Sequence, residues 1–403
     1  MRNRALAVLL AVWISIPSSI YADTCNFPPQ PTFQATPLTD FQPGELYLGR
    51  FPGLLYATSN NPPADHDSDG QVFAGRIHLI NGKVIFLSIG FSNNTIEFCG
   101  GDSFYGNDPP GQQDDPAATV CNQNQALPLT HLICSGAGCP YNQPQSFMGQ
   151  AFRDTSGLVR QNGSIVLVDG AKGGKTLKDW DPTSFGCNCT TEYDRVRDLI
   201  LTPSGFTESQ VQSIWMKNAN PDPTVSLNPN NPNDPNADAN NAERHMGNIM
   251  RYVHTRYPNA QQVFLSPRIY GGYANLSGNP LNPEPYAYEI GFSIKALINS
   301  QIQEQRGNSG DMFAGNLTYN LTNPSLTVAP WIAWGPYLWA SGTTARSDGL
   351  KWLKTDFRYP WPQPDGSFIP NECTHPANNG EQKVGTILLN FMKQSAYTAW
   401  FRP

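Results

Sequence analysis

The stretch KVIFLSIG, residues 83–90, is the most informative segment for the fold. It is an almost unbroken apolar run that ends in glycine, and it does not alternate between apolar and polar positions. A run of this kind indicates a strand that is buried on both faces, because alternation appears only where one face meets water. Strands buried in this way occur in parallel sheets covered by helices on both sides, which places the chain in the α/β class.

Four more segments have the same character. They are SIVLVDG at 164–170, VQSIWM at 211–216, QVFLS at 262–266 and TVAPWIAW at 327–334. Pro330 favours a strand end or a sheet edge for the last one, since proline cannot donate to a sheet ladder. Between and after these runs, helical periodicity predicts helices over 241–257, 285–305 and 380–398. We therefore predict an α/β sandwich, in which helices cover both faces of a mostly parallel sheet of five strands.

Composition narrows the class of protein. Of the 403 residues only 14% are charged. The 36 prolines and 35 glycines make up larger fractions of the chain than the usual values of about 5% for proline and 7% for glycine. Together with 39% apolar residues, this excludes a disordered chain, a coiled coil and a collagen. The net charge of −6 argues against a nucleic-acid partner, because phosphate contacts need clustered cations.

The excess of turn-forming residues falls in particular segments. Residues 23–75 are proline-rich and are expected to be irregular, and two long insertions are expected at 100–150 and 220–242. The second insertion is a run of asparagine, aspartate and proline, which disfavours the interior of a helix or a strand. No linker divides the chain, so we predict a single domain over 23–403.

The first 22 residues resemble a secretory signal peptide. Arg2 and Arg4 precede an apolar run at 5–16, and small residues lead to a cleavage point after Ala22. The run is shorter than the ~20 residues that a membrane span needs, and no later segment is long and apolar enough. An uncleaved anchor is the alternative. We therefore expect a secreted protein, extracellular or periplasmic, with no membrane span.

Eight cysteines in a secreted chain favour disulfides in the loops, up to four in number, with the connectivity left open. Their spacing does not match the paired ligands of a zinc site. Cys373 is expected to be bonded, with no partner assigned. The sequence from Asp65 to Gly70 matches half of a calcium loop, but Arg76 takes the place of the closing glutamate, which favours an ordinary acidic turn.

Candidate functional residues follow the predicted strands. In open α/β sheets, ligands bind beyond the carboxyl ends of the strands. The segments at these ends are 90–93 (GFSN), 170–174 (GAKGG) and 218–221 (NANP), and 372–376 (ECTHP) precedes the last helix. They supply a hydroxyl, a small-residue turn, side-chain amides and a carboxylate three residues before a histidine. This is the set of groups that acyl transfer by a serine nucleophile requires.

In these four blocks, and in their order, the chain resembles the SGNH (GDSL-type) hydrolase superfamily over roughly 83–395, close to secreted carbohydrate esterases. The resemblance implies a three-layer α/β/α sandwich with a flavodoxin-like sheet, no cofactor and no metal. It also implies Ser92 as nucleophile, His375 as general base and Glu372 as the acid that orients the histidine. The backbone N–H groups of Ser92 and Gly170 and the side-chain amide of Asn220 would form the oxyanion hole.

The chain departs from the family pattern in three blocks. Phe91 stands where the family has aspartate, the third block reads NANP, and the acid is Glu372 rather than aspartate. The weak third block leaves Lys217 and Asn218 as alternative oxyanion donors. If Glu372 only caps the last helix, Asp356 and Asp365 are the remaining carboxylates.

The functional prediction is a serine esterase that hydrolyses short O-acyl groups, such as O-acetyl groups, on a carbohydrate. The alternative is a secreted carbohydrate-binding or surface protein that has the fold without the catalysis. The aromatic run Trp331, Trp334, Tyr337, Trp339 and Trp352 allows two interpretations, a platform that stacks on sugar rings or part of the core.

Overall fold

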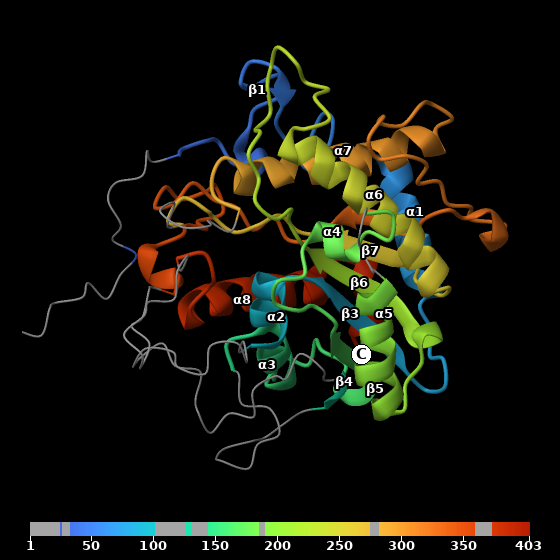
Figure 1. Ribbon diagram of the computed structural model, residues 1–403. Coiled ribbons are helices and arrows are strands. Elements are labelled where there is room, and N and C mark those ends of the chain that lie inside the picture. The colour runs from blue at the N-terminus through green and yellow to red at the C-terminus, as the bar shows by residue number, and fades with distance from the viewer. Residues whose placement is uncertain are drawn as a thin grey trace, which may run out of the picture.

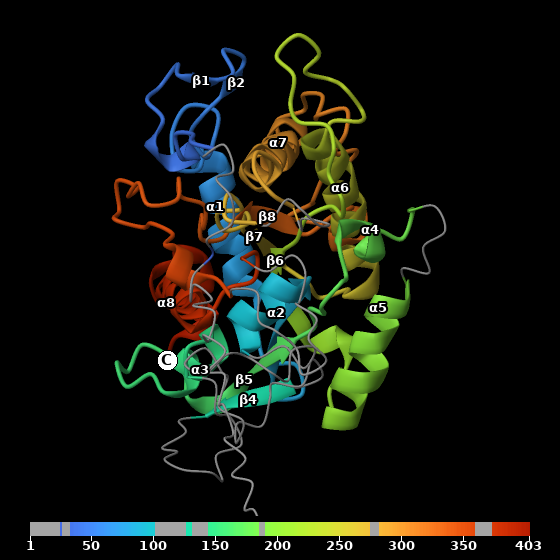
Figure 2. The same ribbon diagram turned by 60° about the vertical axis from the view of Figure 1, so that its left-hand side comes forward.

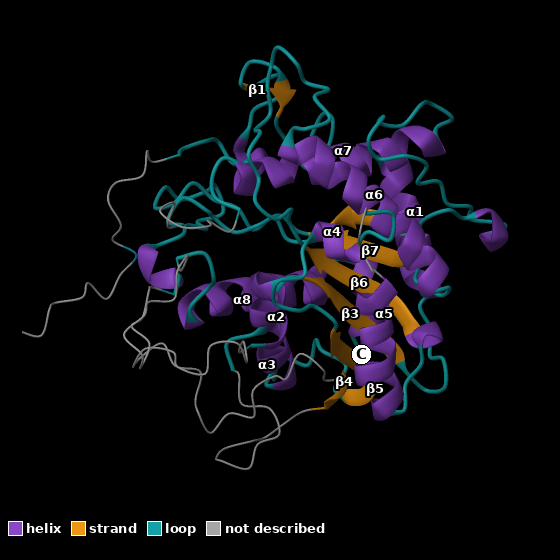
Figure 3. Cartoon of the chain, viewed as in Figure 1, coloured by secondary structure: helices purple, strands orange, loops and turns teal. Residues whose placement is uncertain are grey.

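The structure is a computed structural model, and it describes residues 25, 33–100, 126–130, 144–184, 190–274, 282–358 and 373–403. Its centre is a six-stranded sheet with helices on both faces (Figures 1 and 3). The strands, in their order across the sheet, are β4 (Ala126–Thr130), β5 (Asn162–Asp169), β3 (Val84–Gly90), β6 (Val211–Lys217), β7 (Gln262–Leu265) and β8 (Trp331–Trp334).

The five strands that the sequence predicts are all present and parallel. Taken in chain order, their arrangement across the sheet is second, first, third, fourth and fifth, which is the flavodoxin-like order. All seven residues of β3 are buried, as the unbroken apolar run indicated. The predicted α/β/α sandwich with a mostly parallel sheet is confirmed.

The prediction of five strands is one strand short. The short strand β4 pairs antiparallel with β5 at the edge of the sheet, inside the segment 100–150 that we expected to be an insertion. Its sequence, ALPLT, is too short and too broken by Pro128 to stand out as a strand. Proline is tolerated there because an edge strand has one side without a ladder.

The helices divide between the two faces (Figure 2). One layer contains α1 (Ala64–Arg76), α2 (Ser92–Cys99), α3 (Phe147–Phe152) and α8 (Asn378–Gln394). The other contains α4 (Leu177–Trp180), α5 (Thr190–Arg195), α6 (Asp238–Arg256) and α7 (Tyr286–Gln305), and a π-helical turn, Val196–Leu201, continues α5. Short 3-10 helices lie at Leu38–Asp40, Thr202–Ser204, Glu208–Gln210, Pro324–Leu326, Lys354–Asp356 and Ala396–Phe401, and β1 (Leu46–Tyr47) pairs with β2 (Phe51–Pro52).

Two predicted boundaries are wrong. The N-terminal segment 23–75 is not irregular throughout, since α1 begins at residue 64. Helix α6 begins at Asp238, inside the predicted insertion 220–242, because an acidic residue in the first turn suits the positive end of the helix dipole. The low-complexity composition of 220–242 shows no helical periodicity that would predict this start.

The aromatic run that suggested either a sugar platform or a core belongs to the core. Trp331, Trp334, Tyr337, Trp339 and Trp352 are each no more than 5% exposed. The indole N–H groups of the four tryptophans donate to groups inside the protein. For example, Trp352 donates to the carbonyl of Leu338 at 2.9 Å. These rings therefore stabilise the fold by burying large areas, and they do not offer a surface for stacking.

Glu289 on α7 connects three distant segments. One carboxyl oxygen accepts the hydroxyl of Tyr47 at 3.0 Å, and the other accepts the backbone N–H of Leu227 at 2.9 Å. The side chain is fully buried, and this burial raises the pKa of Glu289 to about 8. The β1–β2 hairpin and the 220–242 segment are thus both attached to α7 through one buried carboxyl group.

We predict that Glu289→Gln changes the pH dependence of stability. The folded-state pKa lies above the unfolded value of 4.5, so the folded protein holds a proton that the unfolded chain releases. The stabilising contribution is therefore complete below about pH 4.5 and is lost as the pH rises through about 8. The melting temperature of the wild type minus that of the variant should fall over this range. The exposed Glu45→Gln is the control, and a difference that stays constant with pH would contradict the account.

Candidate functional site

Ser92 lies where the central strand ends. It is the first residue of α2, with only Phe91 between it and the last residue of β3. Gly90 is required there, because a Cβ atom at this position would lie 2.2 Å from the carbonyl oxygen of Lys217 on β6. The close approach of β3 and β6 thus sets the turn that presents Ser92 at the carboxyl edge of the sheet.

His375 contacts Ser92 across 283 residues of chain. The Nε2 atom of the histidine lies 2.7 Å from the Oγ atom of the serine, which is hydrogen-bond distance for a general base and its nucleophile. Both side chains are buried, with 7% of Ser92 and 3% of His375 exposed. The structure therefore brings together two of the residues that the resemblance singled out.

The loop that carries His375 is held by backbone hydrogen bonds to residues 356–358. The N–H of Arg358 donates to the carbonyl of His375 at 2.9 Å, and the N–H of Cys373 donates back to Arg358 at 2.6 Å. Beyond the histidine, the N–H of Ala377 donates to Asp356 at 2.9 Å. The histidine loop thus has a fixed backbone on both sides of the catalytic candidate.

Two further contacts fix the same loop. Asn93, the residue after Ser92, donates its side-chain amide to the carbonyl of Thr374 at 3.0 Å. Cys373 forms a disulfide with Cys25, so the prediction that Cys373 is bonded is confirmed. A loop that is held at several points keeps its histidine close to one geometry, which favours catalysis by preorganisation.

Part of the predicted site is not described. Glu372 and the alternative carboxylate Asp365 lie outside the described residues, as do Cys121, Cys134, Cys139, Cys187 and Cys189 and the predicted signal peptide at 1–22. The other alternative, Asp356, accepts hydrogen bonds from the N–H of Leu353 at 2.6 Å and from the ammonium group of Lys383.

The groups expected to complete the oxyanion hole have partners within the protein. The N–H of Gly170 donates to the carbonyl of Ser88 at 3.1 Å, which extends the sheet ladder. The side-chain amide of Asn220 donates to the carbonyl and the carboxylate of Asp238, at 3.1 and 3.0 Å. The two alternative donors, Lys217 and Asn218, also have partners within the protein.

Of those alternatives, Lys217 binds the carboxylate of Glu97, and the side-chain amide of Asn218 lies 3.4 Å from the carbonyl of Lys175. Ser92 differs from the other candidates, because its N–H is one of the first in α2 and these have no partner within their own helix. The Ser92 amide is therefore the predicted donor best placed for an oxyanion.

Asp169, the last residue of β5, organises the start of α2 and was not singled out from the sequence. Its carboxylate accepts the hydroxyl of Ser88 on β3 at 2.6 Å and the hydroxyl of Thr95 on α2. Burial raises the pKa of Asp169 to about 6. An aspartate directly after a buried strand was visible in the sequence, but its partners come from two other elements.

A buried ion pair lies on α2 and β6, between Glu97 and Lys217. Neither side chain is exposed. Burial raises the pKa of Glu97 and lowers that of Lys217, and the contact between the two charges opposes both shifts. His375 also acts electrostatically on the pKa of Glu97, so this pair and the histidine belong to one electrostatic cluster.

The half calcium loop is helical in the structure. Asp65, Asp67 and Asp69 lie in α1, where they bind Arg306, Tyr397 and Tyr319 respectively. Within the described ranges, no group of three or more histidine, cysteine, aspartate or glutamate side chains could hold a metal ion. In the same ranges, no helix has the length and apolar character that crossing a membrane requires.

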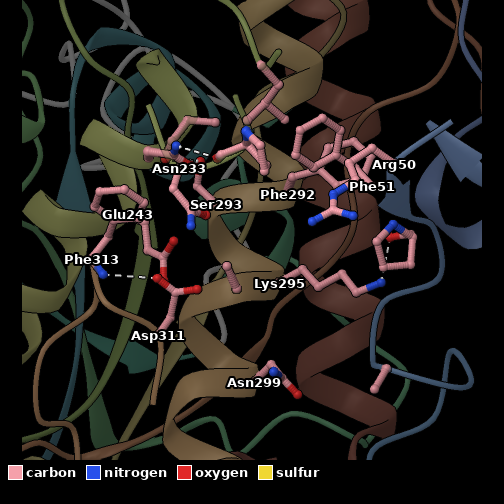
Figure 4. Close-up of a pocket in the computed structure, with 17 residues that line it drawn as sticks. Arg50, Phe51, Asn233, Glu243, Phe292, Ser293, Lys295, Asn299, Asp311 and Phe313 are labelled. Carbon is pink, nitrogen blue, oxygen red and sulfur yellow. Dashed lines mark hydrogen bonds between the residues drawn. The ribbon is translucent and has the colours of Figure 1, made fainter. Parts of the chain in front are cut away.

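A separate cavity of about 350 Å³ lies between α6, α7 and the β2 segment (Figure 4). Its walls combine the rings of Phe51, Phe292 and Phe313 with the carboxyl groups of Glu243 and Asp311. The carboxyl groups point toward one another, and burial, followed by the charge of Asp311, raises the pKa of Glu243. Neither Ser92 nor His375 lines this cavity, so it is distinct from the Ser92–His375 pair.

Comparisons with known proteins add almost no evidence on the function of this site. No protein-family model matches the chain, and no curated protein matches it. A solved structure aligns with 77% of this chain and 96% of its own, at 8% identity and a TM-score of 0.32. A likeness at that level supports no conclusion on fold or function.

We predict that Lys217→Met lowers the free energy of unfolding by about 3–5 kcal/mol, because it leaves the Glu97 carboxylate buried without its partner. The double variant Glu97→Leu, Lys217→Met should recover most of the loss, because it removes both charges from the interior. Urea unfolding measures both. Arg197→Met, which breaks an exposed pair with Asp198, should change stability little. An unchanged unfolding free energy in Lys217→Met would contradict a paired buried charge.

Proposed function

We propose that the protein is a secreted serine esterase that hydrolyses short O-acyl groups, such as O-acetyl groups, on a carbohydrate. The observation that carries the proposal is the 2.7 Å contact between Ser92 Oγ and His375 Nε2 at the carboxyl edge of the sheet. This edge is where open α/β folds bind their ligands. A buried serine at a helix start, with a histidine held rigidly against it, is suited to nucleophilic catalysis.

The reaction has two stages in this proposal. Ser92 Oγ attacks the ester carbonyl while His375 Nε2 takes the hydroxyl proton, and the carbonyl oxygen becomes an oxyanion. The carbon–oxygen bond to the alcohol then breaks, and His375 gives the proton to the departing alcohol. Water then attacks the acyl-enzyme through the same steps, and the carboxylic acid is released. Glu372 is the proposed group that orients His375, and no cofactor or metal takes part in these steps.

The Ser92 amide contributes to oxyanion binding in this scheme. It lies at the N-terminus of α2, where backbone N–H groups point outward and the helix dipole favours negative charge. Nucleophile and donor are then one residue, so the negative charge forms beside the amide as soon as the Oγ–carbon bond forms. The carbohydrate substrate and the secreted location are proposed from the resemblance and from the N-terminal sequence.

A non-catalytic carbohydrate-binding or surface protein is the second candidate. The observation that favours it is the engagement of Gly170 and Asn220 in internal hydrogen bonds, since the family uses these positions as oxyanion donors. Phe91 in place of the family's aspartate points the same way. This candidate predicts binding of a polysaccharide such as acetylated xylan without release of acetate.

We predict that the wild-type protein hydrolyses p-nitrophenyl acetate and that Ser92→Ala lowers kcat by at least about 10³-fold, because the nucleophile is lost. Release of p-nitrophenol measures the rate. Ser325→Ala, at an exposed serine, is the control and should keep wild-type turnover. Unchanged turnover in Ser92→Ala would contradict the mechanism, and a folded wild type without turnover would favour the non-catalytic candidate. Acetylated xylan compared with long-chain esters separates a carbohydrate esterase from a lipase.

A further inference from the structure

Among the residues that the structure describes, Arg268 is a buried cation without a hydrogen-bond partner. It follows β7 by three residues and is therefore at the same edge of the sheet as Ser92. The residue is fully buried, and its Nε, Nη1 and Nη2 atoms make no hydrogen bond within the described ranges. A guanidinium group carries five N–H donors and stays charged in proteins, so burying it unpaired is costly. Such a group in a native fold calls for an explanation.

The position of Arg268 relates it to the nucleophile. Its guanidinium carbon lies 5.0 Å from the ring centroid of Phe91, the residue that precedes Ser92. Its charge also acts on Glu97, the same carboxylate that interacts with Lys217 and His375. Arg268 thus belongs to the cluster of charged groups around the catalytic pair. Arg268 is buried, as are Ser92 and His375, so its burial is compatible with a place in the same site.

The carboxylates near Arg268 are occupied by other partners. Glu97 is bound by Lys217. Glu284, the second carboxyl group whose charge acts on Arg268, accepts the N–H groups of Gly271 and Tyr288 and the indole N–H of Trp339, at 2.7 to 2.9 Å. The guanidinium is therefore near negative charge, while its nitrogen atoms have no hydrogen-bond partner among the described residues.

The proposed oxyanion hole needs a second hydrogen-bond donor. An oxyanion in acyl transfer usually receives two or more preorganised hydrogen bonds. The other predicted donors have partners elsewhere in the protein, namely Gly170, Asn220, Lys217 and Asn218. Among the predicted donors, this leaves the Ser92 amide. We propose that Arg268 completes the oxyanion hole, with its guanidinium donating to the carbonyl oxygen that becomes negative when Ser92 attacks. This inference rests on the proposed esterase function.

The charge balance of the step is complete with the groups present. As the Ser92 Oγ–carbon bond forms, the carbonyl electron pair moves to oxygen, and the hydroxyl proton moves to His375. The new negative charge lies between Arg268 and the Ser92 amide. When the intermediate collapses, the electron pair returns to the carbonyl, the bond to the alcohol breaks, and His375 protonates the alcohol. Arg268 keeps its protons throughout, and it acts by charge and hydrogen bonding in a low-dielectric site.

The test compares Arg268→Met, Arg268→Lys and Arg268→Gln with the wild type on p-nitrophenyl acetate. Removing one oxyanion donor is expected to lower kcat about 10²- to 10³-fold with KM little changed. Arg268→Lys should recover part of the rate, because it restores the charge. The inhibition constant of a boronic acid that forms a tetrahedral adduct on Ser92 should rise in parallel with the loss in kcat/KM.

Arg76→Met is the matched control, because Arg76 lies over the ring of Phe73 at the same 5.0 Å distance but ends α1, before β3 begins. It should leave kcat unchanged. Arg268→Met that keeps wild-type kcat would overturn the inference and leave the esterase proposal standing. A wild type without Ser92-dependent turnover would overturn both. If Arg268→Met fails to fold by circular dichroism, Arg268→Lys and Arg268→Gln decide: equal losses of kcat in both, with boronic acid binding unchanged, would assign Arg268 a structural role alone.

Discussion

The burial of β3 on both faces is the constraint on which the rest of the structure depends. This strand lies between β5 and β6, and none of its seven residues reaches the surface. Helices must therefore cover both faces of the sheet. The polar groups of the proposed site lie where the central strands end. Gly90 and Asp169 set the turn from β3 into α2, and Ser92 is the first residue beyond that turn.

The proposed site is built from a fixed serine and a histidine loop that is fixed separately. Ser92 is positioned by local geometry, a strand end followed at once by a helix. His375 is positioned by distant segments, through the backbone of residues 356–358, the Asn93 amide and the Cys25–Cys373 disulfide. Together these contacts hold His375 at hydrogen-bond distance from Ser92. Glu97 interacts electrostatically with His375, Lys217 and Arg268. The low dielectric of the interior strengthens such interactions between buried charges.

Sequence reasoning succeeded where a local pattern determines structure. Five buried strands follow from unbroken apolar runs that alternate with segments of helical periodicity. It missed β4, because five residues with a proline carry no such pattern, and it missed the start of α1 within an acidic, glycine-containing segment. The internal partners of Gly170 and Asn220 could not be predicted, since Ser88 and Asp238 reach them only through tertiary packing. Arg268 escaped attention for a related reason, because a lone arginine after a strand has no motif around it.

The central claim is that Ser92 is a nucleophile activated by His375. The most direct measurement is covalent labelling of the wild-type protein with a serine-directed fluorophosphonate, followed by peptide mapping by mass spectrometry. The account predicts a single modified peptide that contains Ser92, and loss of labelling when the protein is first unfolded, because reactivity depends on the histidine contact. Label on a peptide that lacks Ser92, or no label on the folded protein, would contradict the account.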